Sequence, residues 1–131
     1  MTPEDFAPLA DLSERMLLSD LATLSALREE LTAAEAEIAA LRARAAREID
    51  MLKGADPAQQ QVAAKWQAQA ERRMRALIQR KAEIAKEEDR ARASALEAFG
   101  RDRAVALLTD RARQTRHARQ RRRAEQDGMP F

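Results

Sequence analysis

Few side chains in this sequence are suited to catalysis. His117 is the only histidine, and it stands in an arginine-rich stretch with no carboxylate cluster beside it. The acidic triplet Glu87-Glu88-Asp89 makes no paired acid and base, because adjacent residues of a helix point in different directions. The chain has no cysteine, and its three glycines are isolated, so neither thiolate chemistry nor a glycine-rich phosphate loop is indicated. We therefore expect a non-enzyme with no metal and no cofactor, in which His117 is an exposed helix residue.

Arginine supplies a different kind of chemistry, which is the recognition of anionic groups. Residues 101–127 contain nine arginines and four acids, and between Arg111 and Arg123 there are seven arginines in 13 residues with no acid. The same segment carries apolar residues beside the cationic ones. An apolar patch on a basic helix favours docking in a groove of a partner protein, with electrostatic steering. The candidate partner-binding residues are Val105, Leu107, Leu108, Arg111, Arg113, Arg116 and Arg119.

Two simpler interpretations of these residues remain open. The apolar residues of the segment could pack on the chain's own beginning, through Phe6, Leu9 and Leu12. The arginine run could be no more than a solvated helix end, since runs of like charge are usually solvated.

The elements that position this segment are indicated by a single interior break, Lys53-Gly54-Ala55-Asp56-Pro57. Gly54 is suited to close one helix at its C-terminal cap. Asp56 is suited to cap the next helix, with Pro57 in its first turn and Gln59 completing a capping box. Two helices joined by so short a turn run antiparallel.

We therefore predict an all-α fold, a long antiparallel two-helix coiled-coil hairpin with a C-terminal helical overhang. Residues 1–131 form one domain. The first helix spans about 9–53, the turn 54–56 and the second helix about 57–125, and the basic overhang covers 101–127.

The apolar residues of both helices have the spacing of a coiled-coil seam. The seam of the first helix comprises Leu24, Leu27, Leu31, Ala34, Ile38, Leu41, Ala45 and Leu52. It misses a step at Glu48. Leu17, Leu18 and Leu21 fit a slightly shifted frame and Ile49 departs from the strict one, and a stutter would explain both departures. The series on the second helix recurs every seven residues and comprises Ala63, Ala70, Leu77, Ile84, Ala91, Ala98, Val105 and Ala112.

The register of the hairpin follows from folding the chain about its turn. Residues whose numbers sum to about 109 then face each other, so that Leu31 meets Leu77 and Leu24 meets Ile84. In this register the second helix extends beyond the first by roughly 25 residues. Within this extension, Val105, Leu107 and Leu108 have no obvious intramolecular partner.

Composition agrees with a helical rather than a globular chain. Ala, Glu, Lys, Leu and Arg account for 81 of 131 residues, whereas Leu, Ile, Val and Phe together number 23. No run of 18 apolar residues is present, and residues 1–6 lack the basic start of a secretory signal. We expect a cytoplasmic protein without membrane insertion, and a monomer or weak homodimer.

One stretch resembles a known family. The segment from Gly100 through Leu108 (Gly-Arg-Asp-Arg-Ala-Val-Ala-Leu-Leu), followed by the arginine run to Arg123-Ala124-Glu125-Gln126-Asp127, resembles the C-terminal helix of the FliJ-like stalk proteins. These proteins belong to flagellar and related type III protein export machines. The resemblance implies a coiled-coil stalk at the cytoplasmic face of the flagellar base. Its partners would be the hexameric export ATPase, the export gate and export chaperones, with Val105, Leu108, Arg111, Arg113 and Arg116 meeting the ATPase ring.

Two other functions remain open. The Ala-rich seam is thin enough that a generic coiled-coil scaffold, dimerising into a four-helix bundle, is an alternative. A basic helical hairpin that binds RNA is the other. It is less favoured because residues 101–127 have no aromatic side chain to stack on bases, and the net charge of the chain is only +2.

Overall fold

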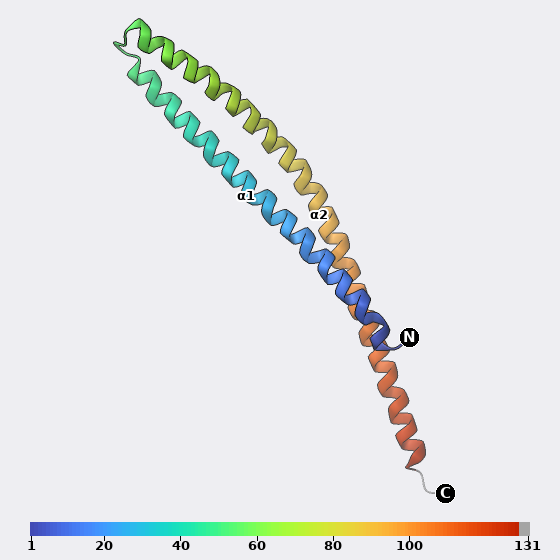
Figure 1. The fold of residues 1–131 in the computed structure, drawn as a ribbon. Helices are drawn as coiled ribbons and strands as arrows, with labels where there is room; N and C mark the ends of the chain where they lie inside the picture. The colour runs from blue at the N-terminus through green and yellow to red at the C-terminus, as the bar shows by residue number, and fades with distance from the viewer. Residues whose placement is uncertain (129–131) are drawn as a thin grey trace. The chain divides into compact units, whose positions relative to one another are not determined.

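The computed structural model, which describes residues 1–128, is an all-α helical hairpin. A 3₁₀-helix, η1 (Pro3–Phe6), leads directly into α1 (Ala7–Met51). The second helix, α2 (Pro57–Asp127), packs against α1, and the described part of the chain contains no strand. Figure 1 shows the reversal of direction between α1 and α2 at the turn. The predicted fold class is confirmed, and both ends of each helix lie within two residues of the predicted ones.

The turn has the predicted chemistry. Gly54 adopts a left-handed backbone with φ of 82°, and no other residue of the described chain has a positive φ. The Asp56 side chain accepts a hydrogen bond from the Gln59 amide at 2.8 Å, and the Gln59 side chain accepts one from the Asp56 amide at 3.1 Å. This reciprocal pair is the capping box, and it fixes the start of α2.

The two interior glycines should respond in opposite ways to alanine. Gly54→Ala is expected to lower the free energy of unfolding by about 1 kcal/mol, because a Cβ is disfavoured in the left-handed region. Gly100→Ala is expected to raise it by about 1 kcal/mol, since Gly100 lies inside α2. An added Cβ meets nothing within 4 Å at either site, so the backbone alone decides the sign. Urea unfolding followed by circular dichroism measures both; a loss of stability in both variants would contradict this account.

The hairpin divides into two compact units, and each is described by itself. The turn unit comprises residues 24–90, and the terminal unit comprises residues 1–23 together with the chain from residue 91 onward. α1 and α2 each contribute to both units.

The core of the turn unit is a narrow seam between α1 and α2. Ile84 is fully buried, and a cluster of Ala34, Ile38 and Leu77 has Leu41 packed against it. Leu77 therefore packs with Ala34 and Ile38, about one helical turn further along α1 than predicted. Its predicted partner Leu31 is half-buried and is not part of this cluster.

The seam itself keeps the predicted spacing. On α2 the seven-residue series is buried or half-buried throughout, as Ala63, Ala70, Leu77 and Ile84 in the turn unit and Ala91, Ala98, Val105 and Ala112 in the terminal unit.

On α1 the predicted stutter is wrong. Glu48 occupies the seam position and is half-buried, whereas Ile49 is exposed. A heptad position held by a charged residue was mistaken for a break in the repeat.

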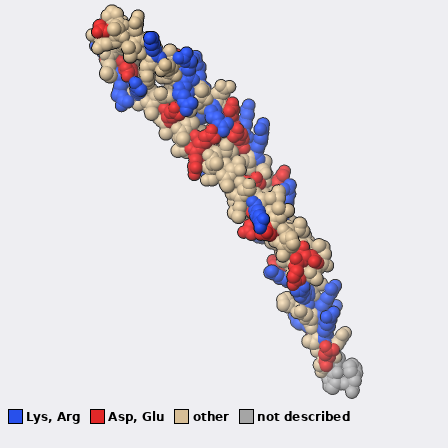
Figure 2. Space-filling model, in the orientation of Figure 1, with Lys and Arg blue, Asp and Glu red and all other residues tan. Residues whose placement is uncertain are grey.

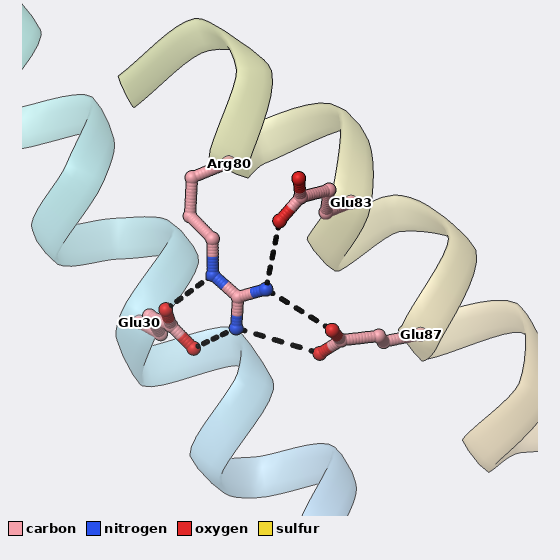
Figure 3. Close-up of polar contacts among 4 residues, drawn as sticks. All are labelled: Glu30, Arg80, Glu83 and Glu87. Atoms are coloured by element: carbon pink, nitrogen blue, oxygen red, sulfur yellow. Dashed lines mark hydrogen bonds and ion pairs between the residues drawn. The ribbon is translucent and has the colours of Figure 1, made fainter. Parts of the chain in front are cut away.

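Ion pairs between the helices flank the seam of the turn unit. The Arg80 guanidinium donates to Glu30 on α1 at 2.6 Å and to Glu87 on its own helix at 3.0 Å, with Glu83 at 3.3 Å (Figure 3). These hydrogen bonds, that to Glu30 first, raise the pKa of Arg80. A bidentate pair joins Arg73 to Glu37 at 2.7 and 2.9 Å. Figure 2 shows acidic and basic side chains interspersed on the surface, as such pairing requires.

Candidate partner-binding surface

In the terminal unit, the beginning of the chain packs along α2. Phe6 is buried, and Ser13 is buried with its hydroxyl donating to the Leu9 carbonyl at 2.6 Å. Ser94 on α2 donates to Asp20 on α1 at 3.0 Å. The Arg116 guanidinium donates to the Glu4 carboxylate at 2.7 Å, in a bidentate pair. The segment 1–23 is thus anchored on α2 by one large apolar side chain and two polar contacts.

This packing corrects the predicted extent of the overhang. A half-buried stripe follows α2 at alternating steps of three and four residues, comprising Asp102, Val105, Thr109, Ala112 and Arg116. Residues 101–127 are therefore not an unpaired overhang: the segment is covered along this stripe as far as Arg116. The 3₁₀-helix η1 begins at Pro3, ahead of the long helix that was predicted from about residue 9, and it extends the coverage. From Arg119 through Gly128 every residue is exposed.

The structure separates the seven predicted site residues into two groups. Val105 and Arg116 are half-buried against the chain's own beginning, as the simpler interpretation of the apolar residues anticipated for Val105. The other five are exposed. They are Leu107, Leu108, Arg111, Arg113 and Arg119. Arg113 has an acidic neighbour on its own helix, Asp110, at 3.9 Å.

An apolar groove lies beside the seam of the terminal unit. It encloses about 300 Å³ and is lined by three large residues of α1, Leu9, Leu12 and Met16. Ser13, Arg101, Ala104 and Val105 complete its lining. Sequence reasoning placed Leu9 and Leu12 on an inward face and did not use Met16 or Ala104. The spacing of Leu9, Leu12 and Met16, at steps of three and four beside the seam, is the signal for a second apolar face.

A cationic hollow lies further along the same unit. It encloses about 240 Å³ and is lined on α2 by Thr115, Arg116, Arg119, Gln120 and Arg123. Residues 1–3 form its other side. A neighbouring hollow takes in Arg113 and His117. His117 is exposed, as expected for a surface helix residue.

The Glu4–Arg116 pair gives a measurable pH dependence. Hydrogen bonding to Arg116 is the main cause that lowers the pKa of Glu4 from 4.5 to about 2. A carboxylate whose pKa is lower in the folded protein than in the unfolded chain stabilises the folded state at any pH above its pKa in the unfolded chain. This stabilisation is lost as the pH falls to the pKa of the carboxylate in the folded protein. The packing of segment 1–23 should therefore weaken as the pH drops from 4.5 toward 2.

Carboxyl NMR titration tests this assignment. Glu4 should titrate near pH 2, and Arg116→Gln should return the pKa of Glu4 toward 4.5. Glu37, whose pKa is lowered by Arg73 in the turn unit, serves as the control and should keep its pKa in that variant. An unchanged Glu4 titration in Arg116→Gln would contradict the packing described here.

Two kinds of structural feature are absent from the described part of the chain. No helix of residues 1–128 is long and apolar enough to cross a membrane. Within the same residues no group of three or more His, Asp or Glu side chains is placed to hold a metal ion. Comparisons with protein-family models, with curated proteins and with solved structures gave no match.

Proposed function

We propose that this chain is a non-enzymatic helical-hairpin adaptor that binds a protein partner through its terminal unit. One observation carries the proposal: an exposed apolar groove lies in the same unit as an arginine run without acids. Leu9, Leu12 and Met16 line the groove, and α2 continues into the segment from Arg111 to Arg123. Isolated surface leucines need no explanation, but apolar side chains gathered in a groove beside a charged surface are typical of interaction sites.

The partner we propose is the export ATPase hexamer of a flagellar type III protein export apparatus. The support is the resemblance of residues 100–127 to the FliJ-like stalk proteins, together with the hairpin fold. In this proposal the chain acts as a stalk at the cytoplasmic face of the flagellar base. Its terminal end contacts the ATPase ring, and the export gate and export chaperones are further partners.

A charge-reversal variant tests the proposal. Arg111→Glu/Arg113→Glu is expected to remain helical, because both side chains are exposed, and to lose stimulation of the ATPase. Opposing like charges at an interface weaken association and slow the encounter. The measurements are circular dichroism and ATP hydrolysis by the purified export ATPase with added chain.

The matched control is Arg72→Glu/Arg75→Glu, which makes the same change of charge at two exposed sites of the turn unit. It should stimulate as the unchanged chain does. Equal stimulation by the Arg111→Glu/Arg113→Glu variant would count against the proposal.

A second candidate function is a scaffold that dimerises into a four-helix bundle. The observation that favours it is a further set of exposed apolar residues in the terminal unit, comprising Leu18, Leu21, Leu96 and Phe99. Sedimentation equilibrium separates the two: the adaptor is a monomer or weak homodimer at micromolar concentration, whereas the scaffold is a stable dimer.

A further inference from the structure

We infer that the groove and the arginines beyond it form one docking surface, and that its occupant is an amphipathic helix of a partner protein with an apolar half and an acidic half. This inference rests on the proposed function and names the chemistry of the partner. It requires three properties of the terminal unit: an open apolar recess, a basic stripe continuous with it, and a reason to prefer an acidic helix.

The recess is open and chemically simple. Leu9, Leu12 and Met16 are each more than two-fifths exposed although they line a groove. The one buried polar group in its lining, the Ser13 hydroxyl, is already satisfied by the Leu9 carbonyl. No buried side-chain nitrogen or oxygen of the described chain lacks a partner. An apolar side chain entering the groove therefore displaces water from carbon surface without disrupting a hydrogen bond.

The basic stripe continues from the recess along one face of α2. Ala104 lines the groove, and helical spacing places Leu108, Arg111, Thr115 and Arg119 on the same face, at steps of four, three, four and four residues. All four are exposed. Neither Arg111 nor Arg119 makes an ion pair with a described residue, and Arg119 also lines the cationic hollow. An apolar section thus passes directly into a cationic one.

The size of the recess argues against a second copy of this chain as the occupant. Leu9 to Met16 is two turns of α1, or about 10 Å of helix. A stable dimer buries about 800 Å² on each partner, which is much more than two turns provide. The occupant therefore needs a second source of attraction. The acid-free arginine stripe supplies it for an anionic helix, in the helix-in-groove mode with charge complementarity.

Synthetic helical peptides probe this surface directly. The test peptide carries leucines at i, i+4 and i+7, followed by glutamates at the same spacing; a control peptide has lysine in place of every glutamate, and another has serine in place of every leucine. Fluorescence anisotropy with the full chain should show binding of the Leu/Glu peptide alone. Its affinity should fall with added salt, because the charge pairs are exposed.

Variants of the chain locate the binding. Leu12→Gln should weaken the Leu/Glu peptide about tenfold, a loss typical of removing one apolar anchor. Leu18→Gln is the matched control, since Leu18 is 58% exposed against 56% for Leu12 and does not line the groove. Arg111→Glu/Arg119→Glu should weaken binding by at least about tenfold and reduce its salt dependence.

Three results would overturn the inference. They are equal binding of the Leu/Lys peptide, equal effects of Leu12→Gln and Leu18→Gln, and binding of a single-stranded RNA oligomer that competes with the peptide and is unaffected by Leu12→Gln. Its failure is distinguishable from failure of the proposed function. Suppose that the chain stimulates the ATPase, that Arg111→Glu/Arg113→Glu abolishes this stimulation, and that the chain does not bind the Leu/Glu peptide. This result overturns only the inference that the partner segment is an acidic helix. If the chain binds the Leu/Glu peptide but has no effect on the ATPase, the inference of an acidic partner helix is supported. The proposal that the partner is the export ATPase is then overturned.

Discussion

Replacing Ile84 by alanine is expected to lower the free energy of unfolding by about 3 kcal/mol. Ile84 is 0% exposed and is the largest fully buried side chain of the described residues. It is also the only large apolar residue between residues 79 and 95. Removing three carbons from such a site costs their transfer free energy and leaves a cavity, and typical losses are about 2–5 kcal/mol. The small residues of this seam leave little with which to fill the cavity.

The measurement is urea unfolding followed by circular dichroism. Ile78→Ala is the matched control, because Ile78 is on the same helix and 51% exposed. It should cost less than about 1 kcal/mol, in proportion to the smaller area it removes from water. Similar losses in the two variants would mean that Ile84 does not face α1 as described.

Replacing Phe6 by alanine is expected to release the beginning of the chain from α2. Phe6 is 6% exposed and is the only large apolar side chain that is buried among the described residues of the terminal unit; the other buried residues of that part are Ser13, Ala95 and Ala98. Losses for buried Phe→Ala are about 3–5 kcal/mol. Because Phe6 is the one large buried side chain of residues 1–13, the loss should appear as local opening rather than global unfolding.

Amide hydrogen exchange resolves this effect by segment. Exchange should accelerate over residues 7–16 in Phe6→Ala and stay unchanged in the turn unit. Phe99→Ala, which alters a 56% exposed phenylalanine of the same unit, should leave both regions as they were. Because Leu9 and Leu12 line the groove, Phe6→Ala should also abolish binding of the Leu/Glu peptide. Protection of residues 7–16 that survives the substitution would contradict the assigned role of Phe6.

The fold was predictable because its signals are local. Each residue of the turn has one role at a helix boundary, and the structure confirms these roles for Gly54, Asp56, Pro57 and Gln59. The seven-residue series on α2 was equally plain, since alanine and large apolar residues alternate with charges at a fixed period. Neither signal depends on what the opposite helix does.

The register and the coverage of α2 were not predictable in this way. They depend on how far α2 must run before it lies alongside α1, and composition carries no record of that distance. The charged seam residue Glu48 added a second difficulty, because hydrophobic periodicity skips such positions. The difference in the packing partners of Leu77 shows that the register was not fixed by the sequence, and the predicted register made the segment after Gly100 appear unpaired.

The predicted partner-binding residues all lie on α2, and the prediction did not include the α1 residues that line the groove beside them. Arg111 and Arg119 are exposed as predicted, while Val105 and Arg116 contact the chain's own beginning. The groove required knowing that Leu9, Leu12 and Met16 lie beside the seam rather than in it. That is a property of two packed helices and cannot be read from one helix alone.

Methionine methyl NMR of the full chain tests the central claim, that a protein partner binds at the terminal unit. Met16 lines the groove, whereas Met51 is the last residue of α1 at the turn and is exposed. With the purified export ATPase added, the account predicts that the Met16 methyl signal shifts or broadens and that the Met51 signal stays in place. A perturbation confined to Met51, or spectra in which Met16 does not change while the ATPase is bound, would contradict it.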